Sequence, residues 1–295
     1  MTVPGAARSR ATAVRATIAA LRAAAVAAVL VFFLFPVYWL VTTAFKVPDD
    51  WFSMPPVFLP SRLTLVNFAG GAAGSMASLT TSIETITPYL RNSVAVAVVT
   101  AFVSTAIAAL AAYAISRFRF GGIGFASWIV SIRMLPPIAT ALPLYVTFKV
   151  LGLLNTWTAL ILVYLVMTTP FSAWVLISFF NEIPRDLDEA AVVDGASTWG
   201  VFRLVALPLA VPGLAAMATL AFIQAWGEFL MALILTSSAA AQTLPIYLGR
   251  FITGFRIAWG PLAAAGLVTM VPVVVFSFIM LRYLIRGLTL GAVKY

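Results

Sequence analysis

Charged and polar side chains inside long apolar segments are the residues of this sequence best placed to do chemistry. Arg133 lies in the stretch SIRMLPP, and Glu228 lies in QAWGEFL with Gln224 one helical turn before it. A charge at the centre of a bilayer costs about 2.5–3.5 kcal/mol on insertion scales, so each should face a protein partner, a neighbouring subunit or water. The three residues are therefore candidates for a translocation path or gate. The alternative is a structural role, as an ion pair between helices or as groups near the membrane interface.

Prolines follow Arg133 within the same apolar segment, at Pro136, Pro137 and Pro143. A proline inside a membrane span frees backbone carbonyls, because it cannot donate the next hydrogen bond of the helix. Such a break either forms a hinge beside a cavity or bends the helix with consequences for packing alone. Both interpretations apply to this segment.

A short acidic stretch, RDLDEAAVVDG, interrupts the apolar sequence elsewhere. Glu189 and Asp194 can form charge-assisted hydrogen bonds with basic groups of a partner protein, and Asp188 belongs to the same cluster. Ala190 and Ala191 are small enough to let a partner surface approach closely. The stretch is therefore a candidate docking surface, and a solvated helix with incidental alanines is the alternative.

Local signals predict a helix, a turn and a second helix across this stretch. Pro184 suits a first helical turn, and acids near that end interact favourably with the helix dipole. Gly195 can end the helix, because it can adopt a turn conformation that a β-carbon disfavours. Ser197 can cap the following helix, which leads into the next apolar segment through Leu207-Pro208.

The composition excludes several classes of protein. The chain is 63% hydrophobic and 9% charged, with a mean hydropathy of +1.07, so the bilayer must act as solvent for much of it. It contains no cysteine and no histidine, which argues against disulfides, a metal site and an intramembrane enzyme. A phosphate-binding GxxxxGK[ST] motif is also missing, so this chain is not expected to hydrolyse ATP.

The predicted fold is all-α, a polytopic membrane protein with six transmembrane helices. Each apolar segment is continuous rather than alternating, which favours helices over a barrel. The predicted spans are 23–45, 93–115, 125–148, 157–180, 207–235 and 261–284.

The distribution of basic residues predicts the topology. The net charge is +9, but the basic residues are scattered between apolar segments, which indicates membrane orientation rather than nucleic-acid binding. Their excess on one side places both termini in the cytoplasm. The expected regions are a cytoplasmic segment at 1–22, the first span at 23–45, an extracytoplasmic loop at 46–92 and a core at 93–295, which includes a cytoplasmic loop at about 181–206.

The stretch EAAVVDGASTWGVFRLVALP resembles the EAA loop of bacterial ABC-importer permeases. That motif is Glu-Ala-Ala, three residues, Gly and a later Leu-Pro, and the matching positions are Glu189, Ala190, Ala191, Gly195 and Leu207-Pro208. The stretches PLYVTFKVLGLLNT and RGLTLGAVKY resemble the carbohydrate-uptake branch, namely the maltose-type second permease subunit. The resemblance covers roughly residues 30–295. One departure is Gly227, since the family usually has Asn before the acid at 228.

This resemblance implies a non-catalytic permease subunit of an ATP-driven importer, in the bacterial inner membrane, for a di- or oligosaccharide or a sugar derivative. In such a family the EAA loop forms a coupling helix that docks on a dimeric cytoplasmic ATPase, which carries ATP and Mg²⁺. The other implied partners are a second permease subunit, an extracytoplasmic sugar-binding protein and membrane lipid. The alternative is an ion- or proton-coupled secondary transporter, in which Arg133 and Glu228 would be the coupling charges and the loop would not be needed.

Overall fold

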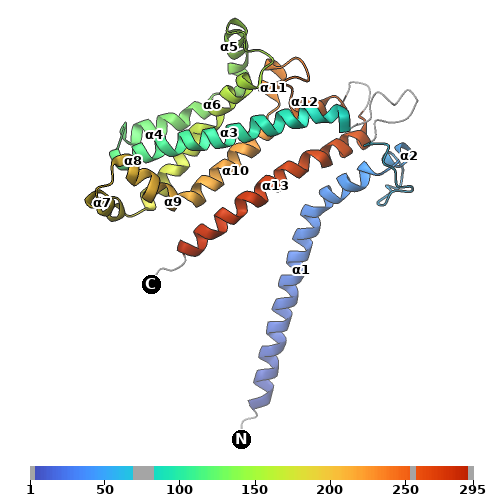
Figure 1. Ribbon diagram of the computed structural model, residues 1–295. Helices are drawn as coiled ribbons and strands as arrows, with labels where there is room; N and C mark the ends of the chain where they lie inside the picture. Colours follow the sequence, from blue (N-terminus) through green and yellow to red (C-terminus); the bar gives the residue numbers. More distant parts are fainter. Residues whose placement is uncertain (1–3, 69–82, 253–256, 292–295) are drawn as a thin grey trace. The chain divides into compact units, whose positions relative to one another are not determined.

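A computed structural model describes residues 4–68, 83–252 and 257–291 of the chain (Figure 1). All regular structure in these ranges is helical, apart from an isolated bridge between Ile252 and Ile257, so the all-α prediction is confirmed. The chain divides into two compact units. The first comprises Met1–Thr81 with Ala258–Leu267, and the second comprises Ser82–Ile257 with Val268–Tyr295.

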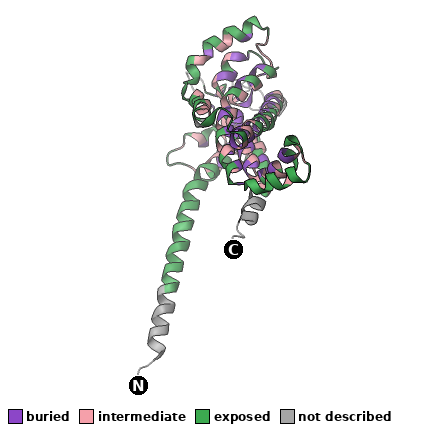
Figure 2. Ribbon diagram, turned by 90° about the vertical axis from the view of Figure 1, so that its left-hand side faces the viewer, coloured by how far each residue is buried: buried purple, intermediate pink, exposed green. Residues whose placement is uncertain are grey.

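The first unit contains α1 (Pro4–Ala44), α2 (Pro48–Trp51) and the first turns of α13 (Trp259–Gly291). Within α1, Arg15–Ala44 is long and apolar enough to cross a membrane, and every residue from 15 to 38 is exposed (Figure 2). Apolar surface of this length requires the bilayer as solvent. Near its end α1 packs on α13 through a small cluster of Ala44, Ala263 and Ala264.

The second unit is built on three helices that lie side by side: α3 (Ile83–Phe118), α6 (Trp157–Glu182) and α10 (Val211–Gly227) (Figure 1). Alanines let them approach closely, because a membrane helix gains its packing energy from short contacts between backbones. Ala108 and Ala112 of α3 and Ala206 before α10 are fully buried. The later part of α13 adds Phe276, whose ring stacks on that of Phe222 with centroids 4.0 Å apart.

Shorter helices complete the second unit. They are α4 (Gly122–Ser131), the 3-10 helix η2 (Ile132–Met134), α5 (Pro137–Val150), α7 (Arg185–Val193), α8 (Thr198–Val201), the π-helix η3 (Phe202–Ala206), α9 (Leu207–Leu209), α11 (Leu230–Leu235) and α12 (Leu244–Gly249). By length and composition, four helices of the described chain can each cross a membrane, and two bent pairs of helices raise this number to six. The count therefore reaches the predicted six if each bent pair is taken as one span.

The predicted span at 125–148 is not one helix. It consists of Ser127–Met134 and Pro137–Val150, which meet at 90°. Leu135 is extended, with ψ 123°, because a residue close before a proline pair is forced away from helical geometry. The proline stretch thus forms a sharp break between the two helices.

The predicted span at 207–235 is broken twice. Helical residues Thr198–Leu209 meet Val211–Gly227 at 75°, beside Pro212 in the first turn of α10. The span then ends at Gly227, because Glu228 is extended with ψ 124°, and α11 begins at Leu230. This continuous apolar sequence therefore forms three separate helical pieces, which are α9, α10 and α11.

The last part of the predicted extracytoplasmic loop at 46–92 belongs to a helix. Helix α3 already begins at Ile83, so the stretch to Asn92 is helical. Asn92 is fully buried and donates through its amide to the backbone oxygens of Ala239 (2.9 Å) and Gln242 (2.8 Å). These bonds attach the segment after α11 to α3. The part of the loop at 69–82 lies outside the described residues.

Candidate functional site

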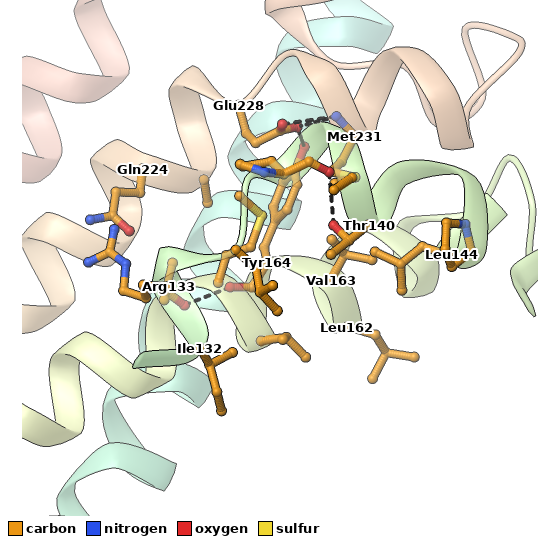
Figure 3. A pocket seen from close by; sticks show the side chains of 18 of the residues that line it. Ile132, Arg133, Thr140, Leu144, Leu162, Val163, Tyr164, Gln224, Glu228 and Met231 are labelled. Carbon is orange, nitrogen blue, oxygen red and sulfur yellow. Dashed lines mark hydrogen bonds between the residues drawn. The ribbon is translucent and has the colours of Figure 1, made fainter. Parts of the chain in front are cut away.

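A cavity of about 760 Å³ lies in the second unit, between η2, α5, α6, α10 and α11 (Figure 3). Arg133, Gln224 and Glu228 all line it. The structure therefore brings together the three polar residues that the sequence singled out, although they come from segments far apart in the chain. The remaining wall is largely apolar and includes Leu144, Leu162, Val163, Val166 and Met231.

Two of the three helix breaks adjoin this cavity. The turn from η2 into α5 places Arg133 and Pro137 on its wall, and the break after Gly227 places Glu228 there. In a membrane, irregular backbone is tolerated where it is covered by protein or lines a cavity, because lipid cannot satisfy free backbone groups. The breaks thus have a physical reason at this location.

Glu228 is held in place by hydrogen bonds. One oxygen, Oε2, accepts from the hydroxyl of Tyr164 (2.9 Å) and from the backbone N–H of Ala232 (3.1 Å). The backbone N–H of Met231 reaches both carboxylate oxygens, at 2.9 and 3.1 Å. The carboxylate therefore satisfies free amides in the first turn of α11 and restarts the helix after the break.

Arg133 has no such carboxylate partner. Its guanidinium carbon lies 4.9 Å from the ring centroid of Phe171, within cation–π range. Among the described residues, the one ion pair joins Arg117 and Asp188, and Arg133 takes no part in it. The predicted alternative of an ion pair between Arg133 and Glu228 is therefore not found. Figure 3 shows the Glu228 carboxylate directed at the Met231 amide, with Arg133 and Gln224 elsewhere on the wall.

Gly227, the departure from the family pattern, has space around it. A β-carbon at this position would meet no atom within 4 Å. The glycine is therefore not required by packing, and a larger side chain at 227 would extend into open space.

The acidic stretch folds as a helix, a turn and a second helix, as predicted. Helix α7 spans Arg185–Val193, and Gly195 has φ +85°, in the left-handed region. The N–H of Ala196 reaches the oxygen of Ala191 (2.9 Å), and that of Gly195 reaches Val192 (2.9 Å), which is the Schellman pattern of a helix end. Ser197 accepts from the N–H of Gly200 (3.2 Å) and caps α8.

Pro184 lies one position earlier than expected, since it precedes the first residue of α7 rather than belonging to its first turn. Leu207 and Pro208 lie in α9, which leads to the 75° bend before α10. The five-residue π-helix η3 between α8 and α9 was not predicted, because apolar periodicity does not distinguish it from an α-helix.

Helix α7 is attached to the end of α3. Arg117 Nε lies 2.6 Å from Asp188 Oδ2, and the same guanidinium donates to the backbone oxygen of Ile183 (3.0 Å). In the reverse direction, Arg185 donates to the backbone oxygen of Ser116 (3.2 Å). Asp188 thus forms an ion pair within its own chain. Arg117 was not among the predicted site residues, although its charge at the end of an apolar segment was the available signal.

The outward face of this loop combines acids with exposed apolar side chains. Glu189, Ala190 and Asp194 are exposed, and Ala191 is partly exposed. The apolar members are Leu187, Val192, Val193, Trp199 and Leu204, of which Val193 is 86% exposed. We refer to these nine residues together with Gly195 as the loop surface. Apolar side chains gathered in this way indicate an interaction site.

Broken membrane helices around a cavity, together with an exposed helix pair at one end of the bundle, define a membrane transport component. Residues 104–290 match the family described as the inner membrane component of binding-protein-dependent transport systems, and the chain belongs to this family. Membership makes it a multi-pass inner-membrane permease and one component of a system that depends on a binding protein.

The chain is similar to several curated proteins over most of its length. It is 38% identical over 262 residues to a probable ABC transporter permease of Sinorhizobium fredii, covering 89% of this chain and 91% of that protein. It is 37% identical to the trehalose transport system permease of Mycobacterium tuberculosis, covering 88% and 92%. It is 34% identical to the trehalose/maltose transport system permease of Thermococcus litoralis, covering 88% and 91%.

Solved structures support the same fold. A chain of a bacterial ABC transporter involved in the import of the acidic polysaccharide alginate gives a TM-score of 0.67 at 19% identity, with 96% of this chain and 99% of that chain covered. A chain of the MetNI methionine ABC transporter gives 0.58 at 20% identity, with 73% and 99% covered. At these identities the similarity concerns the fold alone.

Proposed function

We propose that this chain forms half of the pore of an ATP-driven sugar importer and transmits the work of a separate ATPase through residues 181–206. The observation that carries the proposal is the loop surface, an exposed helix pair whose position is set by Arg117 and Asp188 at 2.6 Å. Exposed apolar side chains rimmed by acidic ones are typical of a surface that a partner protein covers.

The loop surface suits a cytoplasmic ATPase that presents basic groups around a groove. Glu189 and Asp194 are exposed and have no ion pair within the described residues, so their carboxylates are free for charge-assisted hydrogen bonds. Ala190 permits close approach, and Val193 and Trp199 offer apolar area. ATP and Mg²⁺ belong to that partner, and this chain contributes no catalytic residue.

The sugar assignment rests on the relatives. Proteins named for trehalose, trehalose/maltose, sulfoquinovosyl glycerol and diacetylchitobiose transport are 34–37% identical to this chain, each over 88–93% of its length. The cavity of about 760 Å³ lies within the size range of small-molecule sites and carries few polar groups. We assign it to the translocation path, with Arg133 and Gln224 facing the passing sugar.

The remaining components follow from the same proposal. A second, different permease subunit completes the pore, and an extracytoplasmic sugar-binding protein delivers the sugar to the side of the predicted loop at 46–92. Both termini lie in the cytoplasm, as the distribution of basic residues indicates. Glu228 acts as the cap of α11 and not as an ion-coupling group, since four hydrogen bonds already hold its carboxylate.

Reconstitution tests the proposal directly. The complete complex in liposomes should show sugar uptake and sugar-stimulated ATP hydrolysis, and the chain alone should show neither. Ala190→Trp should block docking by bulk and Glu189→Lys should repel the basic partner, so both should lose co-purification with the ATPase while inserting normally. Leu142→Trp, at an exposed position of α5 away from the loop, is the matched control for added bulk. Concentrative uptake by the chain alone, driven by a proton gradient, would refute the proposal and support the secondary transporter.

A further inference from the structure

A second cavity, of about 370 Å³, lies in the first unit and has no role in the proposed function. It lies where α1 ends, between this end, α2 and the first turns of α13. Its walls combine three tryptophans with aliphatic side chains and one lysine. The lining residues are Pro36, Trp39, Leu40, Thr43, Lys46, Trp51, Phe52, Trp259, Leu262 and Ala263.

The polar groups of this cavity are mainly hydrogen-bond donors. Lys46 is 1% exposed, and its ammonium lies 3.8 Å from the ring centroid of Trp39. Two further lining residues, Trp51 and Thr43, have a buried indole N–H and a buried hydroxyl without a hydrogen-bond partner. Each buried group left unsatisfied destabilises the protein, and a buried charge does so more strongly. The lining residues therefore include no anionic acceptor, and a negatively charged ligand would suit the cavity best.

The nearest acid of the same unit does not neutralise Lys46. Asp50 Oδ2 is occupied by the backbone N–H and the hydroxyl of Ser61, each at 2.9 Å, and it forms no ion pair with Lys46 within the described residues. Burial lowers the pKa of Lys46, and the charge of Asp50 opposes this shift only in part. The positive charge of the buried ammonium is thus only partly balanced by negative charge from the same chain.

Packing builds this cavity and holds the lysine in it. The Asn67 amide donates to the backbone oxygens of Ala44 and Lys46, both at 2.9 Å, and so holds the chain after α1. Gly260 of α13 makes room for the surrounding side chains, since a β-carbon there would lie 2.2 Å from Trp51 Cζ2. The arrangement is specific to these residues and is not a gap at a loose surface.

The position of the cavity at the end of an apolar segment indicates its ligand. The apolar segment Arg15–Ala44 ends at this point, and tryptophans gather where hydrocarbon meets the headgroup layer. The abundant anionic acceptors of that layer are lipid phosphodiesters. We propose that the cavity binds the headgroup of a membrane phospholipid, with its phosphate on Lys46 and within reach of Trp51 and Thr43. Its glycerol and acyl portions follow the apolar wall at Pro36 and Leu40.

Lipid retention tests this proposal without reference to transport. The complete complex is equilibrated with vesicles of phosphatidylglycerol and phosphatidylcholine in equal amounts, purified, and analysed for bound lipid by native mass spectrometry. We expect retained phosphatidylglycerol, and we expect Lys46→Met to lower its occupancy at least about tenfold, as for the loss of a charge-assisted contact. Lys149→Met, at an exposed lysine of α5, is the matched control and should not change it.

A Trp51 variant and a competition with soluble glycerol phosphate test the same assignment independently. Trp51→Phe keeps a ring but removes the indole donor, so it should weaken retention even if Lys46→Met does not fold. Soluble glycerol phosphate should not displace the lipid, because the apolar wall contributes to binding, and displacement by it would overturn the assignment to lipid. Equal retention in Lys46→Met and the unaltered chain would also overturn it. So would zero-length crosslinking of Lys46 to a carboxylate of another subunit without bound lipid.

Discussion

Arg117 of α3 holds Asp188 of α7 through an ion pair in which Nε and Oδ2 are 2.6 Å apart. The side chains are 6% and 15% exposed, so neither charge is fully solvated and each depends on the other. Through this pair the short helix of the loop surface is attached to the longest described helix of the second unit. In the proposed function, this ion pair would link a partner docked on α7 to the membrane-spanning bundle.

Breaking this ion pair should uncouple the transporter. Asp188→Asn leaves Arg117 buried without a counter-charge, which typically destabilises a structure by about 3–5 kcal/mol. We expect reduced co-purification with the ATPase and loss of most sugar-stimulated ATP hydrolysis, measured in proteoliposomes. Asp188→Glu keeps a carboxylate opposite Arg117 and is the control, with most of the hydrolysis retained. Full stimulation in Asp188→Asn would show that the pair does not position the loop.

The effect of a substitution at Gly195 should depend on whether the new residue can adopt a left-handed backbone conformation, and not on the size of its side chain. Its φ is +85° and a β-carbon would meet no atom within 4 Å, so only the left-handed backbone opposes a side chain. Gly195→Val should cost about 1–3 kcal/mol locally and misdirect α7, whereas Gly195→Asn should retain most coupling, since Asn adopts this conformation more readily. ATPase stimulation in the two variants, at equal membrane levels, measures the difference. Identical losses would point to steric contact with the partner instead.

Glu228 should act through hydrogen bonding and not through its charge. Glu228→Leu removes the acceptor for the Tyr164 hydroxyl and for two backbone amides, which should destabilise the complex by about 1–3 kcal/mol and lower transport. Glu228→Gln keeps one acceptor oxygen and should retain part of the activity. Thermal unfolding and sugar uptake provide the readout. A Glu228→Gln variant that folds normally but loses only its response to a proton gradient would favour the ion-coupled alternative.

Arg133 should affect transport and not folding. Its side chain is exposed in the cavity and forms no ion pair among the described residues, so removal leaves no buried counter-charge. Arg133→Leu should change the KM or the rate of sugar uptake at an unchanged protein level. Lys149→Leu, at an exposed lysine of α5 that does not line the cavity, is the matched control for loss of a positive charge. Unaltered uptake by Arg133→Leu would remove this residue from the path.

Two glycines of α13 should respond differently to the same substitution. Gly260→Ala would place a β-carbon 2.2 Å from Trp51 and should destabilise the first unit by about 1–3 kcal/mol, as overpacking does. Gly266→Ala would meet its nearest neighbour, Leu40 Cδ1, at 3.5 Å, which is an ordinary contact. Thermal unfolding of the purified complex compares the two. Equal behaviour would mean that Trp51 moves away from its place in the second cavity.

The sequence alone determined the features that depend on neighbouring residues. Continuous apolar segments required helices, because lipid leaves no other partner for the backbone. The turn at Gly195 and the cap at Ser197 were predictable, since both are made by hydrogen bonds within a few residues. Arg133 and Glu228 could also be identified from the sequence, because each is a charged residue inside an apolar segment.

Tertiary structure decided where those features lie in space and which groups meet. Prolines indicated a weak point before α5, but the 90° bend depends on the helices packed around it. Glu228 pairs with amides of its own chain and with Tyr164 instead of Arg133, because the break after Gly227 turns the carboxylate toward α11. Asp188, alone among the four clustered acids, meets Arg117, since packing of α3 on α6 brings distant segments within reach.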